Sequence, residues 1–304
     1  AWILLEQLKA LNPYAVLCQL RQACGLTLDN GQAKENIINY RKKHLGKTLS
    51  LSYETPLKMV RGQGAYLFDE QGTPYLDMVN NVCHVGHCHP QVVAAGQQQL
   101  AKLNTNTRYL HDNIVNYSKK LLATMPDELS VCMLVNSGSE ANELAFRLAR
   151  CYTKSKELIV VDGAYHGNTN ACIEASPYKF NGPGGEGQQD YVHTVTLPDP
   201  YRGEFLGDTD NSAQAYAQSV KDTIEQLHHS GKKTGAFICE SLQGVAGQII
   251  MPAGYLSSVY DHVRDAGGVC IADEVQVGFG RVGTHMWAFE TQDVVPDIVT
   301  LGKP

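Results

Sequence analysis

The sequence lacks the features that mark several large classes of protein. No apolar run approaches the ~20 residues of a membrane-spanning helix, and the stretch from Trp2 to Leu5 is far too short for a signal sequence. There is no excess of basic residues, since the formal net charge is −6, and this argues against general binding of nucleic acid. The nine cysteines include no Cys-x-x-Cys pair, so we expect reduced thiols and a cytoplasmic protein.

The phosphate-binding signatures of nucleotide enzymes are also missing. The chain contains no Gly-x-x-x-x-Gly-Lys-[Ser/Thr] motif, and no Gly-x-Gly-x-x-Gly at a turn from a strand into a helix. A nucleotide-binding α/β protein is therefore disfavoured. What remains is a composition ordinary for a globular protein, 43% hydrophobic and 18% charged in 304 residues, which suits one large or two modest domains.

Both ends of the sequence read as interior parts of a longer protein. Residue 1 is an alanine in a helix-like stretch, and residue 304 directly follows a strand-like run, so we expect a fragment. Three regions are predicted. Residues 1–33 form a helical segment and linker from an upstream region, residues 34–80 the N-terminal part of a small α+β domain, and residues 81–304 an incomplete large domain.

From about residue 90 onward, strand patterns alternate with helix patterns. Strands are predicted at 130–136, 157–162, 192–197, 235–241, 268–274 and 297–302, and helices at 90–102, 111–125, 139–152, 212–229 and 254–266. Earlier in the chain the patterns predict a basic helix at 34–48 and a hairpin at 57–77, and residues 176–190 read as a surface loop. The alternation predicts an α/β fold with a mostly parallel sheet and helices on both faces, whose ligands bind at the carboxyl ends of the strands.

A possible phosphate cradle opens the helix at 139–152. In Ser137-Gly-Ser-Glu140 a serine stands at the N-cap and a glutamate three residues on, which is the capping-box pattern. The free amides of a helix N-terminus favour a phosphate, and Gly138 lets a ligand approach the backbone. An ordinary capped helix has the same pattern.

An acid and a lysine follow two of the predicted strands. Asp273 and Glu274 end the strand at 268–274, where a carboxylate is costly unless it is paired. A pyridinium N–H is a suitable partner, and a magnesium ion or a salt bridge is the alternative. Lys303 follows the strand at 297–302, as a nucleophile in a pocket or as a surface residue. A phosphate cradle, a buried acid and a lysine on one sheet are the parts needed to hold pyridoxal phosphate.

Tyr165, His166 and Gly167 follow the strand at 157–162. An aromatic ring at a strand end can stack on a flat cofactor, although a tyrosine packed in a loop is more common.

The segment around His84, His87 and His89 suggests a metal site, because Cys83 and Cys88 lie among these histidines. The spacing matches no common structural zinc pattern. We therefore predict no metal there.

In their order and spacing these motifs resemble the class III (fold type I) pyridoxal-phosphate aminotransferases, from about residue 50 to the end. The resemblance rests on Asn136–Asn142 (NSGSEAN), Tyr165–Gly167, Ile271–Gln276 (IADEVQ) and Leu301–Pro304 (LGKP). Other stretches resemble one branch of that family, the phospho-lyases that act on ethanolamine phosphate or phosphohydroxylysine. Examples are Pro177–Phe180 (PYKF) and Pro198–Gly203 (PDPYRG).

Carried over to the matching positions, the resemblance implies two catalytic residues. Lys303 would form the Schiff base with the cofactor and later move the proton, and Asp273 would pair with the ring nitrogen. The resemblance further implies cofactor contacts from Ser137, Gly138, Ser139, Tyr165, His166, Glu240, Val275 and Gln276. Among these, Tyr165 and Val275 would lie against the two faces of the ring.

The resemblance implies an enzyme that acts on a primary amine through an external aldimine. Its reaction is transamination or, by resemblance to the branch, phosphate elimination from an amine phosphate. A homodimer is implied for the complete protein, with no membrane or nucleic-acid partner. A phosphate leaving group needs further cations. Arg202, Lys179, Arg108 and His87 are candidates that the sequence does not rank. The alternative is a catalytically inactive interaction module of a multidomain protein.

Overall fold

The computed structural model describes residues 31–303, which fall into two compact units. The first unit ends at Asn106 and the second begins at Thr107. The sequence had placed its internal boundary at residues 80 and 81. Most of the helical segment and linker predicted for residues 1–33 lies outside the described residues.

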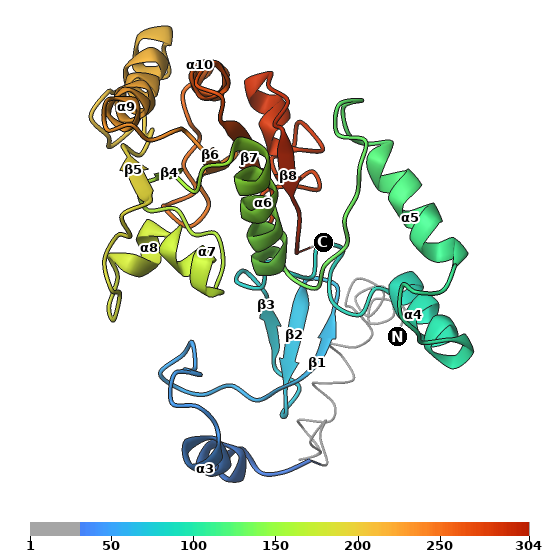
Figure 1. The fold of residues 1–304 in the computed structure, drawn as a ribbon. Coiled ribbons are helices and arrows are strands. Elements are labelled where there is room, and N and C mark those ends of the chain that lie inside the picture. Colours follow the sequence, from blue (N-terminus) through green and yellow to red (C-terminus); the bar gives the residue numbers. More distant parts are fainter. Residues whose placement is uncertain (1–30, 304) are drawn as a thin grey trace, which may run out of the picture. The chain divides into compact units, whose positions relative to one another are not determined.

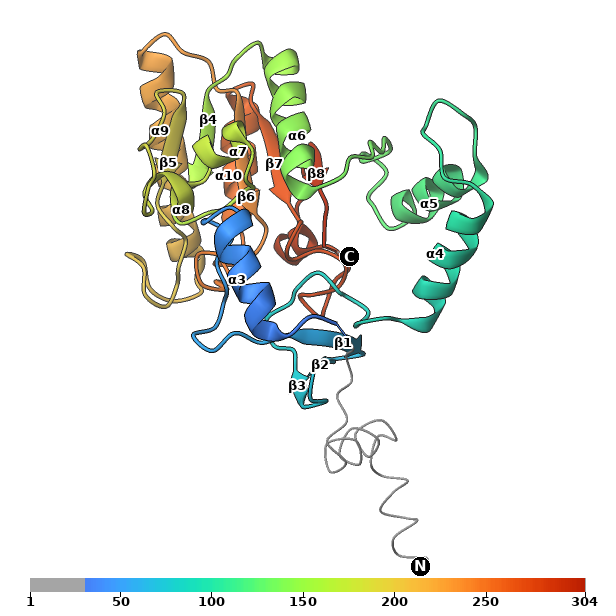
Figure 2. The ribbon, with the colours of Figure 1, turned by 90° about the horizontal axis from the view of Figure 1, so that it is seen from below.

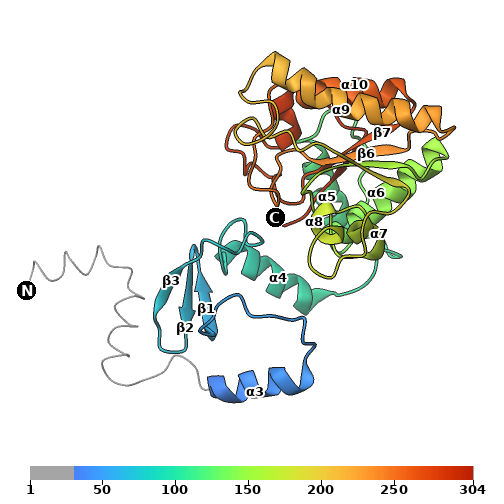
Figure 3. The same ribbon diagram turned by 90° about the vertical axis from the view of Figure 1, so that its left-hand side faces the viewer.

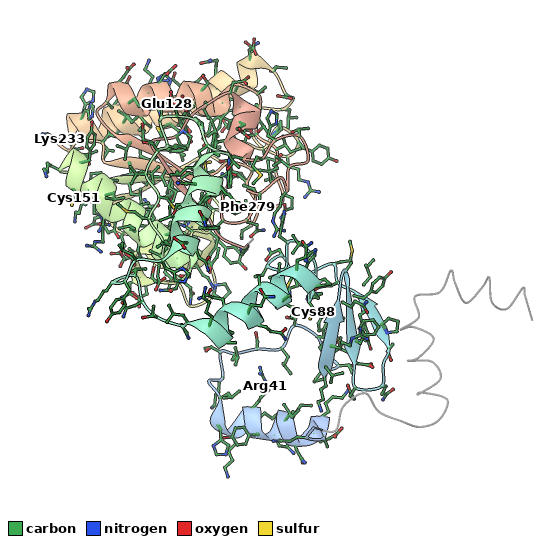
Figure 4. All side chains as sticks on the ribbon, turned by 90° about the vertical axis from the view of Figure 1, so that its right-hand side faces the viewer. Arg41, Cys88, Glu128, Cys151, Lys233 and Phe279 are labelled. Atoms are coloured by element: carbon green, nitrogen blue, oxygen red, sulfur yellow. The ribbon has the colours of Figure 1, made fainter. Side chains whose placement is uncertain are left out.

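The first unit contains a small antiparallel sheet, as the hairpin pattern predicted (Figure 2). Its turn after β2 is held by the Asp69 carboxylate, which accepts hydrogen bonds from the amides of Gln71 at 2.9 Å and Thr73 at 2.8 Å. On α3 the Arg41 guanidinium, labelled in Figure 4, donates to the Leu49 carbonyl over 3.1 Å. The elements are α3 (Lys34–His44), β1 (Met59–Gln63), β2 (Tyr66–Asp69), β3 (Pro74–Leu76) and α4 (Pro90–Lys102).

The second unit is built on a parallel sheet of five strands, in the order β5-β4-β6-β7-β8. The strands are β4 (Leu158–Val161), β5 (Val192–Val195), β6 (Ala236–Glu240), β7 (Val269–Asp273) and β8 (Ile298–Thr300). Every residue of β4, β6 and β7 is buried. Strands covered on both faces read as continuous apolar runs, and this is why the sequence located them.

Helices cover both faces of this sheet, and Figure 3 shows the three layers. The sheet side chains alternate, so that Ile159 and Phe237 pack with α9 and α10, whereas Val160 and Ile238 pack with α6. The helices of the unit are α5 (Asp112–Leu122), α6 (Gly138–Thr153), α7 (Asn170–Glu174), α8 (Pro177–Phe180), α9 (Asp210–His229) and α10 (Tyr255–Asp265), with a 3₁₀ helix η1 (Ala288–Gln292). The predicted α/β fold is confirmed.

The strand predicted at 130–136 is wrong. Residues 131–135 are irregular, as Figure 1 shows between α5 and α6, and Val131 is 79% exposed. A strand needs a partner to satisfy its backbone, and none of the described strands pairs with this segment. A cavity of about 500 Å³ separates it from β8. The sequence also missed α7 and η1, and it assigned α8 to the surface loop at 176–190.

Candidate active site

The predicted site residues of the second unit gather at the carboxyl ends of its strands. Glu240 and Asp273 are the last residues of β6 and β7 and lie side by side in the ladder. Thr300 pairs with Asp273 from β8, and Lys303 follows three residues later. Parallel register therefore brings the acid and the lysine to one edge of the sheet.

The Asp273 carboxylate is almost fully buried and accepts three hydrogen bonds. Its Oδ2 accepts from the Asn142 amide at 2.9 Å and lies 2.8 Å from His166 Nδ1, and its Oδ1 accepts from the Val275 backbone at 3.1 Å. The contact to His166 favours the tautomer with a proton on Nδ1. The opposite nitrogen, Nε2, is buried and has no hydrogen-bond partner among the described residues.

Asn142 on α6 ties the elements of the site together. Its side-chain amide also donates to the His166 carbonyl at 2.7 Å, and its Oδ1 accepts from the Thr300 hydroxyl at 2.7 Å. One side chain thus fixes α6, β8 and the loop after β4 around Asp273. Sequence reasoning gave neither Asn142 nor Thr300 a role. A signal existed for Asn142, because it shares a buried helix face with Ala145, Phe146 and Ala149 and is the one polar residue on it.

The turn into α6 has the predicted N-cap. The Ser137 side chain accepts from the Glu140 amide at 3.1 Å, while the Glu140 carboxylate accepts from Asn136, one residue before the cap. Helix geometry leaves the amides of Gly138 and Ser139 without an intrahelical acceptor. Those two amides are available to an anion.

Two further residues pack closely on this turn. A Cβ built on Gly138 would lie 2.7 Å from a Val275 methyl group, so glycine is required there. The same Val275 side chain also lies against Gly302, where a Cβ would come within 3.0 Å. Val275 therefore contacts both the α6 turn and the backbone next to Lys303.

Lys303 is half-buried, and its ammonium donates to Gln276 Oε1 at 3.2 Å. Its backbone is in the left-handed region, with φ of 51°. The Arg281 guanidinium donates to the Lys303 carbonyl at 2.8 Å and helps to hold that conformation. The contact between Lys303 and Gln276 joins two predicted site residues that follow different strands.

Glu240 and Tyr165 form the other side of the cluster. The Glu240 carboxylate is buried and accepts from the backbone amides of Tyr165 at 3.3 Å and Gly244 at 3.1 Å. Burial, with a smaller contribution from the Asp273 charge, raises the pKa of Glu240 to about 6. Burial also raises the pKa of the half-buried Tyr165 phenol. A buried acid with a raised pKa beside a second carboxylate is typical of functional sites.

Comparison with known proteins assigns the family. The family model for class III aminotransferases matches residues 50–304. The chain belongs to the class III aminotransferase family. It is 56% identical over 277 residues to an alanine–glyoxylate aminotransferase 2-like protein of Drosophila melanogaster, and this match spans 90% of the chain and 56% of the fly protein. A match to an ethanolamine-phosphate phospho-lyase homolog of Caenorhabditis elegans has 40% identity and covers 90% and 61% of the two chains.

A solved structure supports the same family. This class III aminotransferase chain resembles a phospholyase from Arthrobacter in complex with phosphoethanolamine, with a TM-score of 0.81 and 38% identity. That match spans 88% of the chain and 63% of the Arthrobacter chain. The fold type I assignment from sequence is confirmed by this likeness. The chain spans little more than half the length of the fly protein.

Some residues singled out in this chain have other partners in the structure. Glu274 accepts from the amides of Ala288 at 2.8 Å and Phe289 at 2.9 Å, so its carboxylate holds η1 instead. His87 belongs to the first unit, where its Nε2 lies 2.7 Å from the Asp77 carboxylate. Its two neighbours in the suggested metal motif, His84 and His89, also lie in that unit, and no group of metal-ligating side chains forms within residues 31–303.

Gly167 offers a direct test of how the Tyr165 loop packs on the α6 turn. A Cβ there would lie 2.6 Å from Ser139 Oγ, and φ at Gly167 is 133°. We expect Gly167→Ala to lower the free energy of unfolding by about 3 kcal/mol or more, from overlap added to backbone strain. Gly184 is the control, because its φ is 79° but no atom lies within 4 Å of its Cβ position. There alanine should cost only about 1 kcal/mol. Equal losses in urea unfolding would contradict close packing of the two segments.

Proposed function

We propose that the complete protein is a pyridoxal-phosphate enzyme acting on a primary amine, and that this chain carries its cofactor site. The observation that carries the proposal is the buried, three-fold hydrogen-bonded Asp273 carboxylate on the same sheet edge as Lys303. A carboxylate with a purely structural role needs no lysine at the same sheet edge. Pyridoxal phosphate needs both groups, since its protonated ring nitrogen requires an acid and its aldehyde requires a lysine.

The residues present fit that cofactor. The amides of Gly138 and Ser139, at the start of a helix, suit its phosphate. Asp273 is a buried carboxylate fixed by three hydrogen bonds, and a carboxylate suits a pyridinium N–H. His166, which contacts Asp273 through Nδ1, has its Nε2 buried and without a hydrogen-bond partner among residues 31–303, so this nitrogen is available to a polar group of the cofactor. When bound, pyridoxal phosphate supplies a carbonyl for the amine and a ring that withdraws electrons from it.

Each side chain then has a separate task. Lys303 would hold the cofactor covalently, and its amine would then serve as the base that moves the proton on the substrate carbon. Gln276 orients the Lys303 ammonium through the 3.2 Å contact. Tyr165 and Val275 would hold the cofactor ring between them, and Val275 packs closely on the backbones of Gly138 and Gly302. Glu240 would lie on the substrate side.

For the reaction we favour phosphate elimination from an amine phosphate. The Arthrobacter neighbour was solved with phosphoethanolamine, and the nematode relative is named as a phospho-lyase homolog. Transamination is the second candidate, because the fly relative is named as an aminotransferase. Both reactions use all the residues above, so the site residues do not separate them.

The deciding experiment uses the full-length protein loaded with pyridoxal phosphate. It should show a visible absorbance band and release phosphate from ethanolamine phosphate without a keto acid. Amine transfer to a keto acid without phosphate release would favour the second candidate. A protein that binds no cofactor would support an inactive interaction module instead.

We also propose a cytoplasmic homodimer for the complete protein. Every cysteine among residues 31–303 is a free thiol, which suits a reducing compartment. None of the helices described for the chain is long and apolar enough to cross a membrane. A human relative is named as mitochondrial, so cell fractionation with sedimentation of the purified protein is the test. A mitochondrial signal or a monomer would contradict this proposal.

A further inference from the structure

One cation lies beside the candidate site without a carboxylate partner. The Lys179 ammonium, on α8, is 5.6 Å from the centroid of the Tyr165 ring and 5.8 Å from that of Tyr178. The two rings lie edge to face, with centroids 6.0 Å apart. Lys179 is half-buried, and no carboxylate within residues 31–303 forms an ion pair with it.

A lysine ammonium in these surroundings can bind an anionic ligand. Aromatic faces attract an ammonium without accepting its N–H hydrogens as a carboxylate does. The Lys179 ammonium therefore keeps donors for a ligand, at a position where two rings have displaced part of its water. Tyr165 links it to the site, because the Tyr165 amide donates to Glu240 and the next residue, His166, contacts Asp273.

We propose that Lys179 binds the phosphate group of the amine substrate and so determines specificity for amine phosphates. This inference rests on the proposed function. It selects Lys179 from the four candidate phosphate-binding residues that the sequence did not rank.

The other three are less suited to this task. His87 already has the Asp77 carboxylate 2.7 Å from its Nε2. Arg202 lies over the ring of its own neighbour Tyr201, which is 79% exposed, in a loop outside the cluster. Arg108 is exposed in the turn before α5. Lys179, by contrast, lies over the ring of Tyr165, a residue of the candidate site.

A phosphate dianion could come from the substrate or from the cofactor. The α6 turn offers the amides of Gly138 and Ser139 to one phosphate, and we assign that one to the cofactor. Lys179 is then available for the second. The two sources are separated by measuring the affinity for pyridoxal phosphate and for the amines in the same variants.

The test is calorimetric binding to the full-length protein, with ethanolamine phosphate and ethanolamine as probes. Lys179→Gln removes the charge and leaves a polar side chain one atom shorter, whereas Lys179→Arg keeps the charge. Lys156→Gln is the matched control, because its ammonium lies 5.2 Å from the Tyr191 ring at the opposite end of the sheet. We expect Lys179→Gln to weaken binding of ethanolamine phosphate by about 10-fold to 100-fold. Binding of ethanolamine and of pyridoxal phosphate should change less than about threefold.

Lys179→Arg should restore most of the affinity, and Lys156→Gln should have no effect. Equal losses for both amines, or a loss confined to pyridoxal phosphate, would overturn the assignment, as would unchanged binding of ethanolamine phosphate. If binding of ethanolamine phosphate depended on the charge at position 179 but no phosphate were released, the lyase reaction would be refuted and the binding role of Lys179 retained. Phosphate release with an unchanged KM in Lys179→Gln would refute the role of Lys179 and leave the reaction in place.

Discussion

Replacing Lys303 by alanine in the full-length protein is expected to lower turnover by ~10³-fold or more. The variant loses both the amine that holds the cofactor and the base that moves the proton. No other lysine donates to Gln276 within residues 31–303. The cofactor phosphate should still bind at the α6 turn, so we expect the variant to take up pyridoxal phosphate reversibly.

Borohydride reduction of the loaded protein locates the covalent bond. Peptide mapping should find the cofactor on the peptide that contains Lys303. Lys233, exposed at the opposite end of the sheet and labelled in Figure 4, is the control, because its replacement by alanine should leave both label and turnover unchanged. Label on a different lysine, or turnover retained by Lys303→Ala, would contradict the assignment of Lys303 as the cofactor-binding lysine.

Asp273→Asn is expected to lower turnover by ~10²-fold or more while most cofactor binding remains. A neutral amide stabilises a protonated ring less well than a carboxylate does. The amide also cannot accept every hydrogen bond that the carboxylate accepts. If its oxygen faces Asn142 and His166, its NH₂ group faces the Val275 amide, and one buried donor loses its partner at a cost of about 1–3 kcal/mol.

Glu274→Gln separates the two effects of that substitution. Glu274 is equally buried and one residue further along, and it also accepts two backbone amides, but on η1. Its amide variant should lose similar stability in urea and keep turnover within about threefold of the parent. If Asp273→Asn turned over as fast as Glu274→Gln, Asp273 would have no electrostatic role.

The sequence pattern was sufficient to locate those strands of the large sheet that are buried along their whole length. The strands that became β4, β6 and β7 are buried along their whole length, so each is an apolar run that only a covered parallel sheet explains. The segment 130–136 has the same kind of run and forms no strand among the described residues. Strand formation depends on a pairing partner, which local sequence does not encode.

Some residues of the candidate site could likewise be found from the sequence, and others only in the folded chain. Asp273 and Lys303 could be found because a charge at the end of an apolar strand is costly and therefore conspicuous. Their order in the chain also allowed a resemblance to a family. Thr300 gave no such signal, because threonine is common in strands. Its contact to Asn142 joins residues 158 positions apart, which only the folded chain brings together.

The sequence by itself determined the parallel α/β fold, because burial patterns are local properties. The order of its motifs, and the family that they resemble, gave the cofactor class and the two residues proposed for catalysis. Tertiary structure decided the rest. It joined Asn142, His166 and Asp273 into one network, assigned Glu274 to η1, and put Lys179 over the Tyr165 ring. Hydrogen bonds and ring contacts depend on distances of a few ångströms between remote segments, and sequence spacing does not give those distances.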